Sequence, residues 1–257
     1  MNKTFALTIA GLMLAVSTTT IAQSASIQPH RAIIDKKHRI VTFKISNPGA
    51  QATSYDINLI DRSQKEDSST VLDNNYRLSA KKHIKLSPRR KITIKGNSSK
   101  SVRIKVKNLS KLADGEYRSY FKITPSLVIS TEDNDSIQKL KINTSIEVPI
   151  ILRKGTLSSK VTISSKYYKG KLTYKIDYKG DKSFFGDLEI LKGKTSIHKI
   201  SSFAIYPESA QIIKSIPADL TENDSITISL SEVNSSGNLK VTAHMTPTPE
   251  FQSSTIE

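Results

Sequence analysis

Side chains able to do catalytic chemistry are few in this sequence, and they do not form a known catalytic arrangement. The histidines stand singly along the chain, at His30, His38, His83, His198 and His244. None is paired at i, i+4, the spacing that places two imidazoles on one helix face for a metal ion. The Gly-x-Ser-x-Gly motif that exposes a serine nucleophile is also absent. The sequence therefore predicts neither a helical zinc site nor a serine hydrolase.

One segment, Gly193-Lys194-Thr195, resembles the end of a phosphate-binding loop. Leu188 occupies the position of the required first glycine, and no helical pattern follows, so we predict a hairpin turn there. A pair of carboxylates for glycoside hydrolysis stays open, because its separation depends on the fold, but no residue singles one out. We therefore expect a protein that is not an enzyme and uses no cofactor or metal.

The charge balance raises a different possibility. The 257 residues include 39 Lys plus Arg against 23 Asp plus Glu, a formal net charge of +16. Such a surface can bind nucleic acid or another anionic partner. Nucleic-acid readers on β scaffolds also expose stacking aromatics, whereas aromatics are only 6% here. Basic residues interleaved with strand positions, as in Arg103, Lys105 and Lys107, are typical of a solvated sheet face.

The N-terminus indicates the compartment. Lys3 precedes an apolar run from 5 to 16, and small polar residues follow, so we predict a cleaved signal peptide over residues 1–25. The run is short for a membrane span, and the mature chain is expected to be soluble in the periplasm. Cysteine is absent, which excludes disulfides and thiolate metal sites. Secretion without cysteine fits a bacterial envelope protein.

The elements that must position any site are strands. Apolar residues alternate with polar ones in short runs, for example at Val41, Phe43 and Ile45, and turn residues such as Asp114-Gly115 separate the runs. No run has a helical period with caps. Short strands over about 100 residues are typical of an immunoglobulin-like sandwich. We predict one such domain over residues 26–153.

The pattern restarts after Gly155. A second alternating series predicts a C-terminal immunoglobulin-like domain over residues 154–246, and the proline-containing segment 247–257 is expected to be a flexible tail. The predicted fold class is all-β, with two sandwich domains.

Several segments carry a resemblance to a known family. They are Ser87–Ile94 with Ser101–Ile104, Leu112–Phe121 (Leu-Ala-Asp-Gly-Glu-Tyr-Arg-Ser-Tyr-Phe), Val148–Gly155, and Arg31–Asp35 with Ile45–Asn47. The sequence resembles the periplasmic chaperones of the chaperone–usher pilus pathway, most closely their archaic branch. The resemblance covers most of residues 26–155 and is weak beyond them.

This resemblance implies two immunoglobulin-like domains in a boomerang arrangement. It also implies a function: binding pilus (fimbrial) subunits that lack a final strand, completing their fold by donor-strand complementation, and delivering them to an outer-membrane usher. The expected donor-strand residues lie on one face of one strand: Leu140, Ile142, Thr144, Ile146 and Val148. The alternative is an ordinary strand of the sandwich whose apolar face is core and whose Lys139, Lys141 and Asn143 face solvent.

Family members also hold the subunit's C-terminal carboxylate with basic residues. Arg31 matches the first-strand arginine, but the family's lysine partner aligns near Pro149, which cannot serve. The anchor is therefore predicted among Arg31, Arg89, Arg90 and Arg118, because a guanidinium suits bidentate carboxylate binding. The alternative is that these arginines are surface residues or pair internally with Glu116 or Asp114.

A function from another class is also open. The chain could be a secreted two-domain β-sandwich adhesin or anionic-glycan-binding module that uses its basic face. That hypothesis predicts salt-sensitive binding without any subunit.

Overall fold

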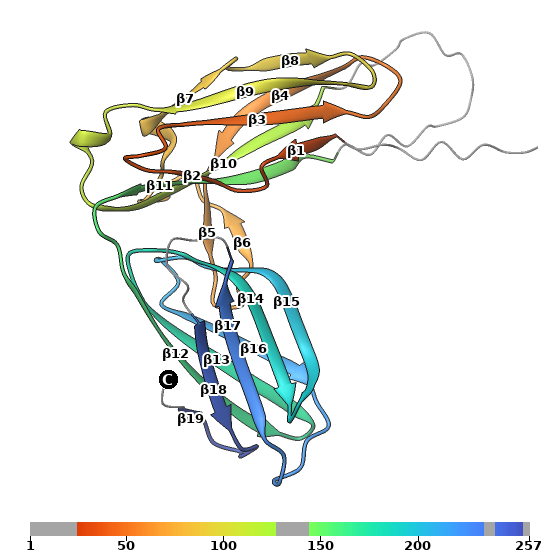
Figure 1. The fold of residues 1–257 in the computed structure, drawn as a ribbon, viewed down its shortest axis with the longest axis vertical. Coiled ribbons are helices and arrows are strands. Elements are labelled where there is room, and N and C mark those ends of the chain that lie inside the picture. Colours follow the sequence, from red (N-terminus) through yellow and green to blue (C-terminus); the bar gives the residue numbers. More distant parts are fainter. Residues whose placement is uncertain (1–24, 127–143, 234–239, 254–257) are drawn as a thin grey trace, which may run out of the picture.

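The computed structural model describes residues 25–126, 144–233 and 240–253, which form two β-sandwiches set at an open angle (Figure 1). The predicted all-β fold with two sandwich domains is confirmed. Helical structure in the described residues is confined to two 3₁₀ turns, η1 (Lys81–His83) and η2 (Leu109–Lys111). Residues 1–24 of the expected signal peptide lie outside the described residues.

The N-terminal sandwich consists of two sheets. The first has the order β1 (Ser26–Gln28), β3 (Ile40–Asn47), β9 (Ser98–Val106), β7 (Ile84–Ser87). The second has the order β2 (Ala32–Ile34), β11 (Ile146–Lys154), β10 (Gly115–Pro125), β4 (Thr53–Ile60), β8 (Lys91–Ile94). Alternation sends every second side chain between the sheets, where the rings of Phe43 and Phe121 stack with centroids 4.9 Å apart.

The C-terminal sandwich has a separate core. One sheet has the order β16 (Gln211–Pro217), β13 (Lys171–Gly180), β12 (Ser159–Tyr168), β19 (Gln252–Ser253), and the other β15 (Thr195–Ile205), β14 (Phe184–Lys192), β17 (Ile226–Glu232), β18 (Lys240–Met245). The predicted turn at Gly193-Lys194 joins β14 to β15, and Gly193 adopts φ +56°, so the hairpin prediction is confirmed. The segment between β11 and β12 connects the domains.

Gly155 begins this connection with φ +82°, a conformation that favours glycine. A Cβ atom there would also come within 2.5 Å of the Asp114 carboxylate. The turn out of β11 therefore requires glycine.

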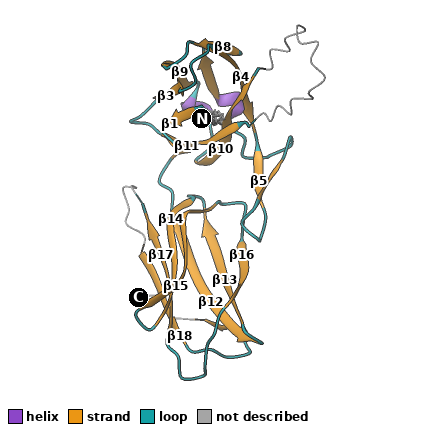
Figure 2. Ribbon diagram, turned by 90° about the vertical axis from the view of Figure 1, so that its right-hand side faces the viewer, coloured by secondary structure: helices purple, strands orange, loops and turns teal. Residues whose placement is uncertain are grey.

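A second connection is made by the small hairpin of β5 (Arg62–Gln64) and β6 (Thr70–Leu72). Figure 2 shows β5 lying between the two sandwiches. At its turn, the Ile213 amide donates a hydrogen bond of 2.8 Å to the Glu66 carbonyl. The hairpin, which belongs to the N-terminal half of the chain, thus bonds to the edge strand β16 of the C-terminal domain.

The segment expected to be a flexible tail contributes β19, which pairs with β12 at Ser164 and Ser165. The Tyr167 amide donates to the Thr248 carbonyl at 2.6 Å, and Lys166 lies 4.8 Å from the Phe251 ring centroid. This segment covers the edge of β12.

Removing residues 246–253 is therefore expected to expose the β12 edge and to promote self-association through it. The loss of these contacts also lowers the free energy of unfolding by about 1–2 kcal/mol. Sedimentation velocity across a concentration series measures the association. The variant Phe251→Ala, which keeps the backbone pairing, is expected to stay monomeric; a truncated protein that also stays monomeric contradicts the edge-covering role.

Candidate functional site

The central feature of the candidate site is one edge of β11. β11 pairs with β10 along its whole length, from Ile146 to Lys154, but β2 pairs with it only from Ile150 to Leu152. Among the described residues, no strand pairs with Ile146–Pro149 on the side of β2. An unpaired edge of this kind is the element that binds an added strand in β-augmentation.

The hydrogen bonds around Arg118 on β10 determine which groups face that edge. Its amide donates to the Leu78 carbonyl and its carbonyl accepts from the Ala80 amide, so its backbone points away from β11. Directions alternate along a strand, and pairs in an antiparallel ladder alternate between bonded and non-bonded. Ile151, opposite Arg118, therefore faces β2. By the same alternation Glu147 and Pro149 face the open edge, whereas Ile146 and Val148 bond to β10.

Pro149 marks the end of this edge. Proline has no N–H, so the open edge offers no donor at Pro149, and an added strand finds backbone donors only before it. β2 begins its pairing one residue later, at Ile150. The open stretch is thus bounded by Pro149 on the side of the domain connection.

Of the five predicted donor-strand residues, the structure describes three, and they differ in exposure. Leu140 and Ile142 lie outside the described residues. Thr144 precedes β11 and is exposed, Ile146 is half-buried against the domain core, and Val148 is 2% exposed within it. Ile146 and Val148 lie on the same face of β11, as their alternation indicates, but alternation alone does not show which apolar side chains pack in the domain's own core. At Val148 the side chain is buried in its own domain and the backbone bonds to β10, so neither is available to a partner.

The Glu147 side chain on this strand pairs with two basic side chains. Arg62 donates from Nε to Oε2 at 2.6 Å and from Nη2 to Oε1 at 3.2 Å, and Lys122 lies 3.4 Å from Oε1. Burial opposes ionisation of Glu147, but the bonds from Arg62 and Lys122 prevail and lower the pKa of its carboxyl below the usual 4.5. The ion pair ties β11 to the β5–β6 hairpin.

A carboxyl whose pKa is lower in the folded than in the unfolded protein adds stability above the unfolded pKa. That contribution is lost as the pH falls through the lowered folded pKa. We therefore expect Glu147→Gln to reduce the free energy of unfolding by about 1 kcal/mol at pH 7, and the difference from the unmodified protein to vanish by pH 2. Urea unfolding across this range measures it. A difference that does not change with pH contradicts the assigned ion pair.

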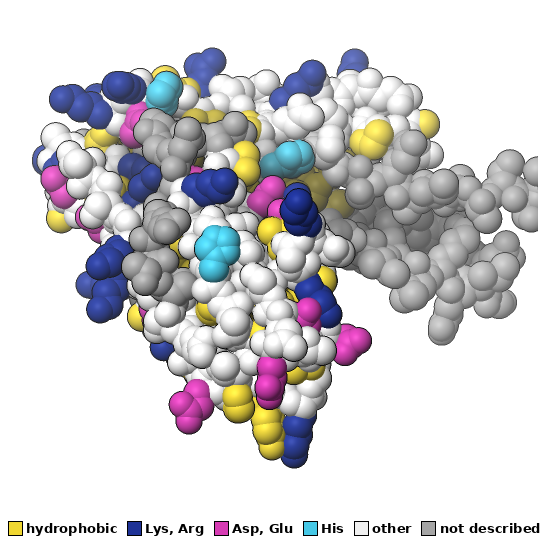
Figure 3. Space-filling model, turned by 60° about the horizontal axis from the view of Figure 1, so that its bottom comes forward, with side chains coloured by type: hydrophobic (Ala, Val, Ile, Leu, Met, Phe, Trp, Pro, Cys, Tyr) yellow, Lys and Arg dark blue, Asp and Glu magenta, His cyan; other side chains and the backbone are white. Residues whose placement is uncertain are grey.

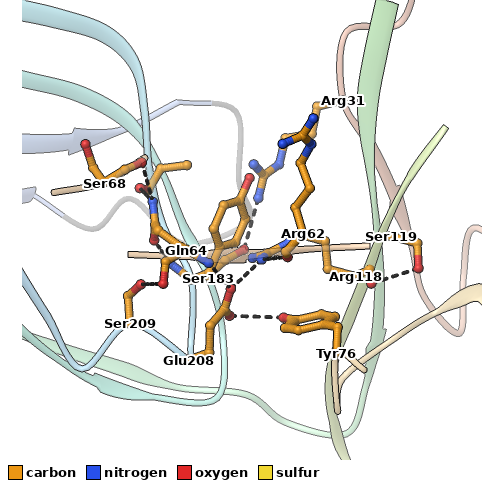
Figure 4. Close-up of polar contacts among 12 residues, drawn as sticks. Arg31, Arg62, Gln64, Ser68, Tyr76, Arg118, Ser119, Ser183, Glu208 and Ser209 are labelled. Atoms are coloured by element: carbon orange, nitrogen blue, oxygen red, sulfur yellow. Dashed lines mark hydrogen bonds and ion pairs between the residues drawn. The ribbon is translucent and has the colours of Figure 1, made fainter. Parts of the chain in front are cut away.

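A second cluster lies between the domains and includes Arg31 and Arg118 (Figure 4). Their guanidinium carbons lie 5.9 Å and 3.4 Å from the Tyr206 ring centroid. Arg31 precedes β2. Its Nη2 donates to the Ser183 hydroxyl at 3.0 Å, and its guanidinium carbon lies 4.5 Å from the Phe185 ring centroid. Its Nε and Nη1 are buried and have no partner among the described residues. Arg118 has the same two nitrogens without partners, but it already pairs with Glu208, whereas Arg31 forms no ion pair with another described residue. Arg31 is therefore the cation here best prepared to bind an anion.

Arg118 is already engaged. Its side chain is 2% exposed, and its Nη2 contacts the Glu208 carboxylate and donates to the Arg62 carbonyl at 2.7 Å. The Tyr206 ring lies 3.4 Å from its guanidinium carbon. Burial opposes the charge, but Glu208 and the surrounding tyrosine oxygens raise the pKa of Arg118. Arg118 therefore stays a cation with an internal counter-ion.

Glu208 also joins the β5–β6 hairpin to the C-terminal domain. It accepts from the Gln64 amide at 3.2 Å and from the Tyr76 hydroxyl at 3.0 Å. Burial raises the pKa of Tyr76, so its hydroxyl stays neutral and able to donate. The Gln64 side chain donates to the Ala204 carbonyl at 2.9 Å and accepts from the Tyr206 amide at 3.0 Å. Gln64 and Glu208 were not among the predicted site residues, and no motif or periodicity marks them.

Glu116 and Asp114, named above as alternative internal partners of the predicted arginines, pair with other residues. Glu116 instead accepts from Arg153 Nε at 2.8 Å and from the Ser183 amide at 3.1 Å. Asp114 lies 3.4 Å from the Lys154 ammonium. Arg153 also lies within 3.4 Å of the Ser183 hydroxyl that binds Arg31, so the two guanidinium groups converge on one serine. Both Arg153 and Lys154 lie at the end of β11, next to the domain connection.

Arg89 and Arg90 are not brought to this cluster. Both are exposed in the turn between β7 and β8, where the Arg90 carbonyl accepts from Ile57. The Arg118 side chain bonds to Arg62, which lies five residues after Ile57. At the usual rise of a strand, five residues separate the two bonding positions by about 17 Å. Of the four predicted arginines, the structure therefore brings together Arg31 and Arg118 only.

Two further observations concern other kinds of site. Over the ranges given above, no group of three or more His, Cys, Asp or Glu side chains is arranged to hold a metal ion. No helix in the same part of the chain has the length and apolar character needed to cross a membrane. Lys and Arg side chains are spread over the face drawn in Figure 3 and are most frequent along its upper edge.

Comparison with known proteins gives likeness at the level of structure. No family model matches the sequence, and no curated protein matches it. The YadV chaperone is 11% identical, with a TM-score of 0.53 over 87% of this chain and 100% of that one. The Escherichia coli chaperone DraB is 11% identical, with a TM-score of 0.50 over 88% and 97%.

A third solved structure is the Salmonella enterica SafA pilin in complex with the SafB chaperone. It is 15% identical, with a TM-score of 0.50 over 88% of this chain and 98% of that one. These likenesses extend over most of the described chain and both sandwiches. They show that the fold is shared with these chaperone structures.

Proposed function

We propose that this protein is a periplasmic chaperone of pilus subunits, which binds them by donor-strand complementation and delivers them to an outer-membrane usher. The observation that carries the proposal is the open edge of β11 at Ile146–Pro149, in a fold shared with pilus chaperones. Backbone bonds to this edge would hold an incomplete subunit with little dependence on its sequence. The function requires no catalytic group and no cofactor.

Some residues near this edge can contact a subunit with their side chains, and others with their backbone groups. Thr144 is exposed and Ile146 is half-buried, so both can contact a subunit, while Leu140 and Ile142 remain predicted donor residues. Glu147, whose backbone faces the open edge, would supply backbone groups to the added strand. A strand added there would run beside β11 opposite β10, extending the sheet by one strand.

Arg31 is the proposed anchor for the C-terminal carboxylate of the subunit. Arg31 has two buried nitrogens, Nε and Nη1, without partners in the described residues, and each can donate to a carboxylate oxygen. A bond to this cation in a site largely closed to water is strong. Arg118 is assigned a supporting role, because it holds Tyr206 and Glu208 in place beside Arg31.

The test of the proposal is co-expression in the periplasm with a candidate subunit that lacks its final strand. A one-to-one complex that survives purification is the expected result. Recovery of free, aggregated subunit in the presence of the folded protein would contradict the function. A complex that forms equally well with a subunit already completed by its own extra strand would contradict the mechanism.

Replacing Arg31 by Gln is expected to lower subunit recovery at least about tenfold, because one charge-assisted bond is lost. Arg89→Gln removes the same charge from an exposed turn and serves as the matched control, with recovery unchanged. The measurement is the ratio of subunit to chaperone after affinity purification. Equal losses in the two variants contradict the anchor.

A further inference from the structure

One sheet face of the N-terminal domain carries positive charge without a single acidic residue in its strands. The four strands β1, β3, β9 and β7 contain neither Asp nor Glu. Five basic side chains point outward on β3, β7 and β9 or directly after β9, and all are exposed: Lys44, Lys85, Arg103, Lys105 and Lys107. We refer to these five residues as the cationic face.

The charges of the cationic face are not compensated. None of the five forms an ion pair with another described residue. Lys85 stands directly opposite Lys105 in the β7–β9 register, and Arg103 lies two residues along the same face. Like charges in directly opposite positions destabilise a sheet. These basic side chains repel one another and weaken the sheet that carries them. An anionic partner that binds the face would offset this repulsion, which would explain why the cluster is present.

The composition of the face separates the candidate partners. The centres of protein–protein interfaces are rich in aromatic residues and poor in lysine, whereas this face carries lysines, and Phe43, the one aromatic residue of its strands, is buried in the core. Readers of single-stranded nucleic acid also need stacking aromatics. Ile40, 49% exposed, is the large apolar side chain beside the charges, opposite Lys105. Lysines spread across neighbouring strands with one exposed aliphatic side chain match a laterally continuous anionic layer.

We propose that the cationic face binds the anionic phospholipid surface of a membrane. Each basic side chain close to such a surface contributes attraction that falls off within about 8 Å in physiological salt. Ile40 would enter the headgroup layer while the sheet lies flat on it. The contact is reversible and leaves the open edge of β11, which belongs to the other sheet, available for a subunit.

The test uses vesicles of phosphatidylcholine with 30% phosphatidylglycerol, and vesicles of phosphatidylcholine alone. The face variant Lys85→Glu/Arg103→Glu/Lys105→Glu is compared with the control variant Lys171→Glu/Lys179→Glu/Lys194→Glu. The control lysines are exposed in the C-terminal domain, and both variants change the net charge equally. Co-sedimentation is expected to show binding to the anionic vesicles only, lowered by about tenfold or more in the face variant. The control variant should lose less than about threefold.

Two results would overturn the proposal. Equal losses in the two variants would mean that net charge alone attracts the protein. Retention on heparin without vesicle binding would mean that the ligand is an anionic glycan. If the face variant is unstable, Lys85→Gln/Arg103→Gln/Lys105→Gln replaces it, with the matching Gln control. Subunit capture by the face variant is measured in parallel, and its retention shows that membrane binding and the chaperone function fail independently.

Discussion

Placing a proline at Glu147 is expected to abolish subunit capture while the protein stays folded. The Glu147 amide faces the open edge of β11, so its removal breaks no bond to β10. The added strand loses a donor and meets the proline ring, and we expect a cost of about 2–4 kcal/mol, or about thirtyfold to a thousandfold in affinity. Measured subunit recovery should therefore fall below detection.

Two matched variants isolate the backbone effect. Glu147→Ala removes the same carboxylate, and with it the pair with Arg62, but keeps the amide, so subunit capture should be retained. Val148→Pro removes an amide that faces β10 and is expected to destabilise the domain itself by about 3 kcal/mol. Capture that is lost equally in Glu147→Ala and Glu147→Pro would show that the side chain, not the strand edge, is required. Ile146→Asp is a less specific test, because Ile146 also packs on the domain core.

Removing the carboxylate of Glu208 is expected to be the most destabilising change between the domains. In Glu208→Ala, the Arg118 cation stays buried without its counter-ion, and Tyr76 and Gln64 lose an acceptor. Breaking one side of a buried ion pair costs about 3–5 kcal/mol. Urea unfolding measures the loss. Small-angle scattering is expected to show a broader distribution of domain angles, because the β5–β6 hairpin loses part of its attachment.

The double variant Arg118→Met/Glu208→Leu distinguishes an unpaired charge from lost packing. Replacing both partners by apolar residues removes the buried cation, so most of the lost stability should return. A loss below about 1 kcal/mol in Glu208→Ala, or a double variant as unstable as the sum of the two single ones, would contradict the assigned role of this pair.

The parts of the fold that depend on local pattern could be predicted from the sequence. Alternation at Val41, Phe43 and Ile45 gave a correct strand, β3, and the glycine at 193 gave a correct turn. Both follow from two-residue periodicity and backbone preference, which are properties of short segments. The division into two sandwiches followed from the same signals.

Interactions between distant segments could not be predicted in this way. Gln64 and Glu208 are 144 residues apart, and neither belongs to a periodic pattern that would mark it. Arg118 was predicted as a candidate anchor from its residue type, but its partner comes from the other domain. Val148 fits the alternating face of a donor strand equally well whether its own domain or a partner buries it. Only the arrangement of both sheets shows that Val148 is buried in the core of its own domain.

The most direct test of the central claim is amide hydrogen exchange along β11, measured residue by residue in the free protein and in a subunit complex. In the free protein, the amides of Ile146 and Val148 should be protected by β10, and that of Glu147 should exchange rapidly. In the complex, Glu147 should become protected at least about tenfold, while Ile151, which faces β2, should change little. A complex in which Glu147 still exchanges rapidly would contradict strand addition at this edge.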